Sequence, residues 1–273
     1  MFRKVLAAVG LLAACAPSAQ AQITPRPEVL TGAFTPGFVG EADEERYPVR
    51  TVRIGEVQIS SGRVILADPF LMSMRDRPLT VSVPPGLYPV DLAVADAGDS
   101  GQRVALARLL LSDAAPVRWA LAVTDEQDPA ALTGSNIFGY GVDAGTGAFV
   151  DAAVPAWLES EYAWAAGVRY LEQVEGPDPA ILRPHIGEVD RYMTLVEGWQ
   201  TRGEAAAPAL GLPYGFALVE PLGPGGAAMF SSGWGDGYYA SWVGYDANHR
   251  PAVIVTDFAV ITAVNFPPAS DSR

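Results

Sequence analysis

The segment LTVSVPPGLYPVDLAV, residues 79–94, indicates a fold built mostly from β-strands. Its first five residues alternate apolar and polar side chains, which is typical of a half-buried strand. Pro84-Pro85-Gly86 then forms a turn signal, and an apolar run follows from Leu87 to Val94. Two short apolar runs that flank such a turn predict antiparallel strands.

The same pattern extends in both directions along the chain. Towards the N-terminus, apolar residues alternate over 52–59, and residues 64–66 form another short run after Ser61-Gly62. Towards the C-terminus, we expect residues 103–111 and 117–123 to pair with each other across Ser112-Asp113. Further strands are predicted at 214–220, 226–232, 238–245 and 252–258.

Two segments have helical periodicity instead. Apolar residues recur every three or four positions over 153–173, with Asp151 expected as the N-cap and Pro155 in the first turn. Residues 186–200 predict a second helix, followed by a loop of small residues at 203–213. We therefore expect an α+β fold, mostly antiparallel β (a curved sheet or a sandwich-like pair), with one or two packed helices.

The composition is that of a globular protein with an acidic surface. The chain has 273 residues, of which 49% are hydrophobic and 18% are charged, enough to build a substantial core. Its formal net charge of −13 argues against a nucleic-acid partner, because a phosphate backbone requires a clustered cationic face. We expect one domain over 46–265, followed by a short tail at 266–273.

The N-terminus resembles an export signal over residues 1–21. Arg3 and Lys4 precede a ten-residue apolar stretch, Val5 to Ala14. As a helix this stretch spans about 15 Å, roughly half of a bilayer core, so it is too short to be a membrane anchor. Residues 22–45 begin with a segment rich in proline and threonine, and we expect them to be a flexible tether.

Two cleavage sites compete in this signal. Leu12-Ala13-Ala14-Cys15 resembles a bacterial lipobox, in which Cys15 would be lipidated, whereas Ala19-Gln20-Ala21 resembles an ordinary signal peptidase site. The first predicts a lipoprotein of the outer membrane or periplasm whose only membrane contact is its lipid. The second predicts a periplasmic or secreted protein. Either cut leaves 16 basic against 31 acidic side chains, a formal charge of −15, and removes Lys4, the only lysine.

Aspartates are the candidate catalytic residues. The two histidines, His185 and His249, are both expected in loops and form no metal-binding or triad motif. Asp143 and Asp151 flank a glycine-rich turn that could hold an anion or direct two carboxylates at a cation or a sugar. The alternative is a β-hairpin that ends in a helix cap. Asp236 and Asp257 complete the candidates, and no motif predicts a metal or a cofactor.

An aromatic cluster is the candidate binding surface. Trp234, Tyr238, Tyr239 and Trp242 surround the Asp236-Gly237 turn signal. Aromatic rings beside carboxylates suit a carbohydrate or aromatic ligand, but they suit the packed face of a sheet equally well. The sequence leaves this alternative open.

A succession of motifs resembles a bacterial family, the domain of unknown function 4241. In order along the chain they are PPGLYPV at 84–90, RVALARL at 103–109, PVRW at 116–119, YGVDAGTG at 140–147 with Asp151, GDGY at 235–238, GYD at 244–246 and TDF at 256–258. The resemblance covers about residues 50–260. It implies one domain and offers no catalytic role to carry over to this chain, because the family has no established activity.

Three functions from different classes follow from the sequence. The first is a non-catalytic binding or interaction module attached to the cell envelope, whose protein or glycan partner is unknown. The second is a carboxylate- or metal-dependent hydrolase acting on glycans, which predicts that Asp143 and Asp236 converge in one cleft and that one carboxylate has a raised pKa. The third is an immunity-type or toxin-associated protein whose acidic surface binds a basic partner.

Overall fold

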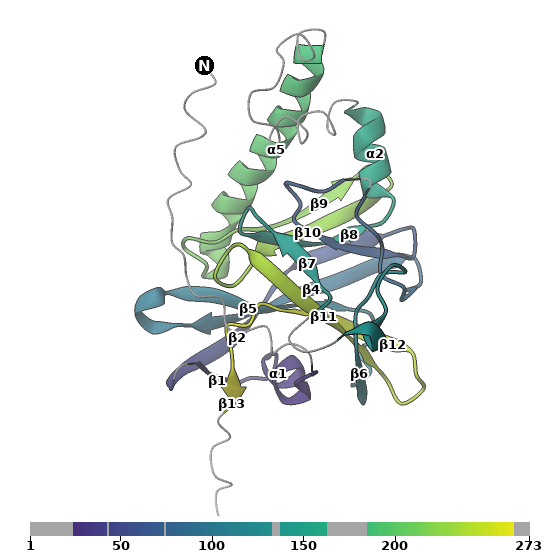
Figure 1. Ribbon diagram of the computed structural model, residues 1–273. Helices are drawn as coiled ribbons and strands as arrows, with labels where there is room; N and C mark the ends of the chain where they lie inside the picture. The colour runs from purple at the N-terminus through teal and green to yellow at the C-terminus, as the bar shows by residue number, and fades with distance from the viewer. Residues whose placement is uncertain (1–23, 43, 74, 133–136, 163–184, 265–273) are drawn as a thin grey trace, which may run out of the picture.

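Two antiparallel sheets form the body of the protein (Figure 1). The computed structural model describes residues 24–42, 44–73, 75–132, 137–162 and 185–264. Within these residues the larger sheet has nine strands and the smaller sheet has four. The prediction of a mostly antiparallel, curved or sandwich-like α+β fold is therefore confirmed.

The larger sheet contains strands from nearly the whole described chain. Its order is β13 (Ala263–Val264), β1 (Val39–Ala42), β2 (Glu45–Ile59), β4 (Gly86–Asp96), β5 (Gln102–Leu110), β12 (Pro251–Asp257), β11 (Gly237–Tyr245) and β6 (Arg118–Leu121), and β7 (Tyr140–Val142) also pairs with β11. The smaller sheet has the order β3 (Val64–Ala67), β8 (Thr146–Asp151), β10 (Gly225–Ser231) and β9 (Ala217–Leu222).

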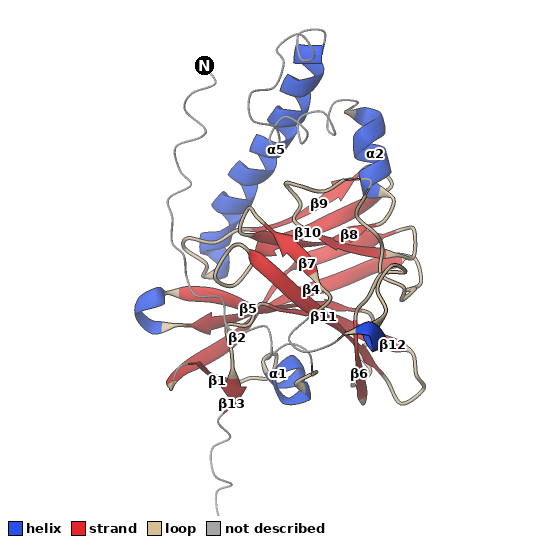
Figure 2. Cartoon of the chain, viewed as in Figure 1, coloured by secondary structure: helices blue, strands red, loops and turns tan. Residues whose placement is uncertain are grey.

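The smaller sheet separates two hydrophobic cores, because successive strand residues point to opposite faces. Phe149 of β8 and Phe230 of β10 face the core shared with the larger sheet, and their ring centroids are 5.1 Å apart. Val150 and Met229 point the other way, into a second core. Helices cover this outer face (Figure 2), and the buried Trp199 is one of their contributions to it.

The helices are α2 (Val154–Glu161) and α5 (Ile186–Ala206). The second extends six residues beyond the predicted end at 200 and includes part of the loop predicted at 203–213. An ion pair of 2.7 Å between Arg202 of α5 and Glu220 of β9 joins this helix to the smaller sheet. The predicted helix 153–173 is described only as far as 162, and the rest of it lies outside the described residues.

The N-terminal segment differs from the flexible tether predicted for residues 22–45. Residues 27–42 contain helix α1 (Pro27–Gly32) and strand β1, and Val29 and Leu30 of the helix are buried in the first core. Arg26 forms an ion pair of 2.6 Å with Asp257 and donates a hydrogen bond to the carbonyl of Ile261. Apolar burial and these contacts hold the segment on the larger sheet.

Four local predictions need correction. Strand β5 does not pair with β6 across Ser112-Asp113, because β4 and β12 occupy both of its edges and β6 pairs with β11 instead. Residues 79–83 form isolated bridges rather than a sheet strand. The 140–151 segment is not a hairpin, because β7 and β8 belong to different sheets. The N-cap of α2 is Ala153 rather than Asp151.

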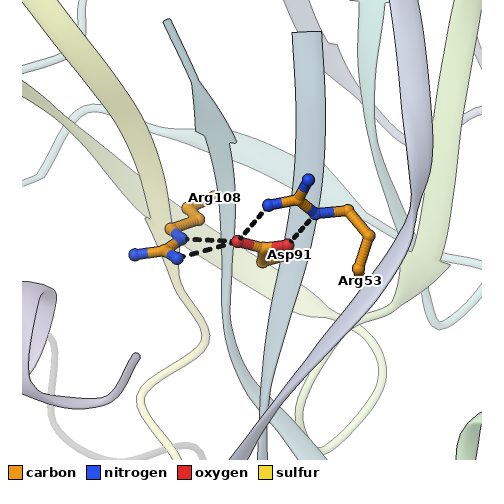
Figure 3. A network of polar contacts seen from close by, with 3 residues as sticks. All are labelled: Arg53, Asp91 and Arg108. Atoms are coloured by element: carbon orange, nitrogen blue, oxygen red, sulfur yellow. Dashed lines mark hydrogen bonds and ion pairs between the residues drawn. The ribbon is translucent and has the colours of Figure 1, made fainter. Parts of the chain in front are cut away.

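A buried carboxylate joins three neighbouring strands of the larger sheet (Figure 3). Asp91 of β4 lies directly opposite Arg53 of β2 and Arg108 of β5 in the strand register. Its side chain is 2% exposed and binds both guanidinium groups, that of Arg108 at 2.8 Å. The ring of Phe34, which follows α1, packs on Arg108 with 4.2 Å between the guanidinium carbon and the ring centroid.

Candidate functional site

A cleft of about 560 Å³ opens between β7 and the loop that follows β3. This size falls within the range of about 300–1,000 Å³ found for small-molecule sites. Four segments of the chain line the cleft; they contribute Asp68, Leu71, Arg75, Asp76 and Arg77 after β3, Glu126 after β6, Gly139 and Asp143 at the two ends of β7, and Tyr238 on β11.

The buried carboxylate of Asp68 lies at the inner end of the cleft. One oxygen accepts hydrogen bonds from the backbone N–H groups of Asp143 at 2.9 Å and Ala144 at 2.7 Å, and the other accepts from Phe70 at 3.0 Å. The next N–H of the turn, at Gly145, donates to the carboxylate of Asp236 at 3.0 Å. The glycine-rich turn proposed to hold an anion therefore binds carboxylates of its own chain.

Asp68 is the carboxylate with a raised pKa, and it was not among the predicted site residues. Burial is the main cause, and the nearby charge of Asp143 adds to it, while the three backbone N–H groups oppose the shift. The only signal in the sequence is an aspartate that precedes a proline directly after an apolar run, which marks a turn. Its partners at 143 and 144 are 75 and 76 residues away.

Two opposite charges on the rim of the cleft are exposed. Among the described residues, neither the carboxylate of Asp143 nor the guanidinium of Arg75 has a hydrogen-bond or ion-pair partner. Arg77 differs, because it pairs with Glu126 at 3.1 Å. The cleft thus presents one unpaired anion and one unpaired cation from separate segments.

Apolar and aromatic surface borders the same cleft. Leu71 is 38% exposed and Tyr238 is 49% exposed. The hydroxyl of Tyr238 accepts a hydrogen bond of 3.1 Å from the N–H of Gly139, which fixes the ring beside β7. A ligand in the cleft would therefore meet charge and apolar surface together.

The remaining candidate aspartates have structural partners and do not line the cleft. Asp151 is fully buried, and its carboxylate accepts from the N–H groups of Ser60, Ser61 and Ala153. Asp257 is paired with Arg26. Asp236 binds the N–H of Gly145 in the turn that follows Asp143, but it is not among the lining residues, so the two carboxylates do not line one cleft.

The predicted aromatic surface is divided between the core and the rim. Tyr239 and Trp242 are buried in the first core, and burial raises the pKa of Tyr239 to about 12. Trp234 is half-buried, with the guanidinium carbon of Arg103 5.3 Å from its ring centroid. Of the four aromatic residues, Tyr238 alone lines the cleft, and the adjacent Tyr239 points to the opposite face of the strand.

A second hollow of about 550 Å³ is lined in part by residues 144–146 of the same turn. Phe70, Tyr214 and Phe216 contribute its aromatic surface, and Gln200 and Glu204 of α5 contribute polar groups. Those two polar side chains already bind each other at 3.0 Å. This hollow therefore lacks the unpaired pair of charges that the cleft presents.

Other predicted features lie away from the cleft. His185 is the N-cap of α5, and His249 occupies the turn between β11 and β12 with a φ of 61°. Within the described ranges, no group of three or more His, Cys, Asp or Glu side chains is arranged to hold a metal ion. None of the helices in this part of the chain is both long and apolar enough to cross a membrane. Cys15 and the signal segment lie outside the described residues.

Comparisons with known proteins place the chain in a family. Searches of curated proteins and of solved structures gave no significant match. A family described as "Protein of unknown function (DUF4241)" matches residues 57–256, which include every cleft residue named above and exclude α1 and β1. This match confirms the resemblance seen in the sequence motifs, and the chain belongs to this family.

Proposed function

We propose that this protein is an exported, non-catalytic binding module of the cell envelope, anchored by a lipid on Cys15, with the cleft as its ligand site. One observation carries the binding role. Asp151, Asp236 and Asp257 already bond to backbone N–H groups or to arginine. The exposed charges of Asp143 and Arg75 in the cleft have no such partner among the described residues. This arrangement favours recognition over acid–base chemistry.

The export and the anchor are supported by the sequence. The basic Arg3-Lys4, the apolar Val5–Ala14 and the single cysteine at position 15 match the order of a lipoprotein signal. Cleavage after Ala21 is the alternative and would give a periplasmic or secreted protein. The acidic balance favours neither nucleic acid nor direct membrane binding by the folded part.

Labelling with palmitate and fractionation of cells test the anchor. The wild-type chain should incorporate label and remain in the detergent-extracted envelope fraction, and Cys15→Ser should abolish both. Ala21→Leu is the matched control, because it blocks only the ordinary peptidase site. An unlabelled, soluble protein whose processing depends on Ala21 would overturn the anchor and establish the alternative.

A second candidate function is a glycan hydrolase that uses Asp68 and Asp143. Its support is the raised pKa of the buried Asp68 near the exposed carboxylate of Asp143, since the general acid of a glycan hydrolase has a raised pKa. Release of reducing sugar from cell-wall glycans by the wild-type chain, lost in Asp68→Asn and in Asp143→Asn, would establish it. Unchanged glycans over a prolonged incubation would eliminate it.

A further inference from the structure

We propose that the cleft binds a small zwitterion, an amino acid or a short peptide, by pairing its ammonium with Asp143 and its carboxylate with Arg75. This inference deepens the proposed function and rests on the cleft being the ligand site. It names the class of ligand, which the sequence motifs and the family leave open.

Most charged groups of the cleft are already bound within the fold. Asp68 binds three backbone N–H groups, Arg77 binds Glu126, and the N–H of Gly139 binds Tyr238. Within the described part of the chain, the side chains of Asp143 and Arg75 make no such contact. The lining carboxylate of Asp76 accepts a hydrogen bond from the N–H of Ser73, so Asp143 and Arg75 are the charged lining groups left for a ligand.

The carboxylate and the guanidinium together select one ligand chemistry. A guanidinium binds a carboxylate through two parallel N–H donors, and a carboxylate accepts charge-assisted hydrogen bonds from an ammonium. A simple anion or a simple cation would satisfy one rim charge and leave the other unpaired. A zwitterion satisfies both at once.

The balance of charge around the cleft also bears on the class of ligand. Acidic lining residues outnumber basic ones; they are Asp68, Asp76, Glu126 and Asp143 against Arg75 and Arg77. This excess disfavours multiply charged anions such as phosphates and favours a ligand that carries a positive group. The exposed surfaces of Leu71 and Tyr238 add an apolar contact that suits the side chains of a peptide.

Isothermal titration of the purified full chain tests the proposal with four probes. They are L-alanyl-L-leucine, free L-leucine, N-acetyl-L-alanyl-L-leucine, which lacks the ammonium, and L-alanyl-L-leucinamide, which lacks the carboxylate. We expect the free dipeptide to bind best, and each blocked form to bind about fivefold more weakly for the loss of one charged contact. No heat from either the dipeptide or leucine would overturn the ligand class.

Variants assign each end of the ligand. Asp143→Asn should weaken the binding of the free dipeptide about fivefold and leave the affinity for the acetylated form unchanged. Arg75→Gln should also weaken the binding of the free dipeptide about fivefold, but it should leave the affinity for the amide unchanged. Both side chains are exposed, so neither substitution removes a core contact. Asp99→Asn and Arg46→Gln, exposed residues outside the cleft, are the matched controls and should change nothing. An equal loss of affinity for all probes would overturn the assignment of the ammonium to Asp143 and of the carboxylate to Arg75.

Recovery of the titrated dipeptide separates this inference from the proposed function. An intact dipeptide, bound with the predicted dependence on both charges, supports a non-catalytic module that recognises zwitterions. Binding followed by cleavage to the two amino acids would keep the ligand class and overturn the non-catalytic role. Absence of binding by an envelope-anchored protein would overturn the ligand class alone.

Discussion

The larger sheet and the inner end of the cleft each bury a carboxylate, but they satisfy it with different partners. Asp91 is 2% exposed and lies between the guanidinium groups of Arg53 and Arg108. Asp68 is 4% exposed and binds three backbone N–H groups, with no cationic partner among the described residues.

The difference decides how each region responds to protons. The contact with Asp91 raises the pKa of Arg53, so the cation of this pair stays charged. Backbone N–H groups carry only partial charges, and at Asp68 they do not offset the burial that raises its pKa. The sheet therefore pairs its buried carboxylate with two guanidinium groups, while the cleft holds a buried carboxylate whose protonation is favoured by burial.

The largest expected effect is at the sheet. Asp91→Ala should reduce the free energy of unfolding by about 3 kcal/mol, because it leaves the partly buried Arg108 without its counterion. This loss lies at the low end of the range for breaking a buried ion pair, since Arg53 is 52% exposed and remains solvated. Urea denaturation followed by tryptophan fluorescence measures it.

The matched control for this substitution is on the same strand. Asp96→Ala, at the exposed end of β4, should change the free energy of unfolding by less than about 0.5 kcal/mol. Equal effects of Asp91→Ala and Asp96→Ala would show that the ion pair contributes nothing beyond a surface charge.

A smaller effect is expected at the cleft. Asp68→Asn should reduce the free energy of unfolding by about 1.5 kcal/mol, because one amide oxygen replaces two acceptors and the amide N–H₂ faces a donor. The same urea titration measures this loss. A loss as large as that of Asp91→Ala would mean that backbone N–H groups stabilise a buried carboxylate as strongly as arginine does.

Burial of Asp68 should also make the stability of the fold depend on pH. The folded chain protonates Asp68 at a higher pH than the unfolded chain, whose aspartate has the ordinary pKa of 3.8. Folding is then linked to proton uptake, so this group adds stability as the pH falls. Asparagine takes up no proton, and the destabilisation by Asp68→Asn should be larger at about pH 3.5 than at about pH 7. The opposite trend would show that the backbone N–H groups outweigh burial.

The sequence predicts strands well where apolar runs end at turn residues. Strands β10, β11 and β12 lie within a residue of the segments predicted at 226–232, 238–245 and 252–258. Pairing is less predictable, because it depends on competition between distant segments. Strand β12 takes the edge of β5 that nearby β6 was expected to occupy, since it offers a longer buried partner.

The cleft shows the same limit at the level of single residues. Asp143 was found because it lies in a glycine-rich motif, and Tyr238 because it lies in an aromatic one. Asp68 has no such motif, and its burial and partners arise only when β3 is brought beside β7. Asp151 and Asp257 have motifs of the same kind as Asp143, yet in the fold their carboxylates bind neighbouring N–H groups and an arginine.

The smallest effect on stability is expected at the rim of the cleft. Asp143→Asn should change the free energy of unfolding by less than about 0.5 kcal/mol, because the side chain is exposed and the backbone N–H still donates to Asp68. The substitution removes a negative charge that raises the pKa of Asp68, so the pH dependence of stability assigned to Asp68 should weaken. Urea titrations of Asp143→Asn across the same pH range measure both effects. A large loss of stability with no change in its pH dependence would mean that Asp143 supports the fold. In that case Asp68 and Asp143 would both be structural, and Asp143 would no longer be distinguished as an exposed carboxylate available to a ligand.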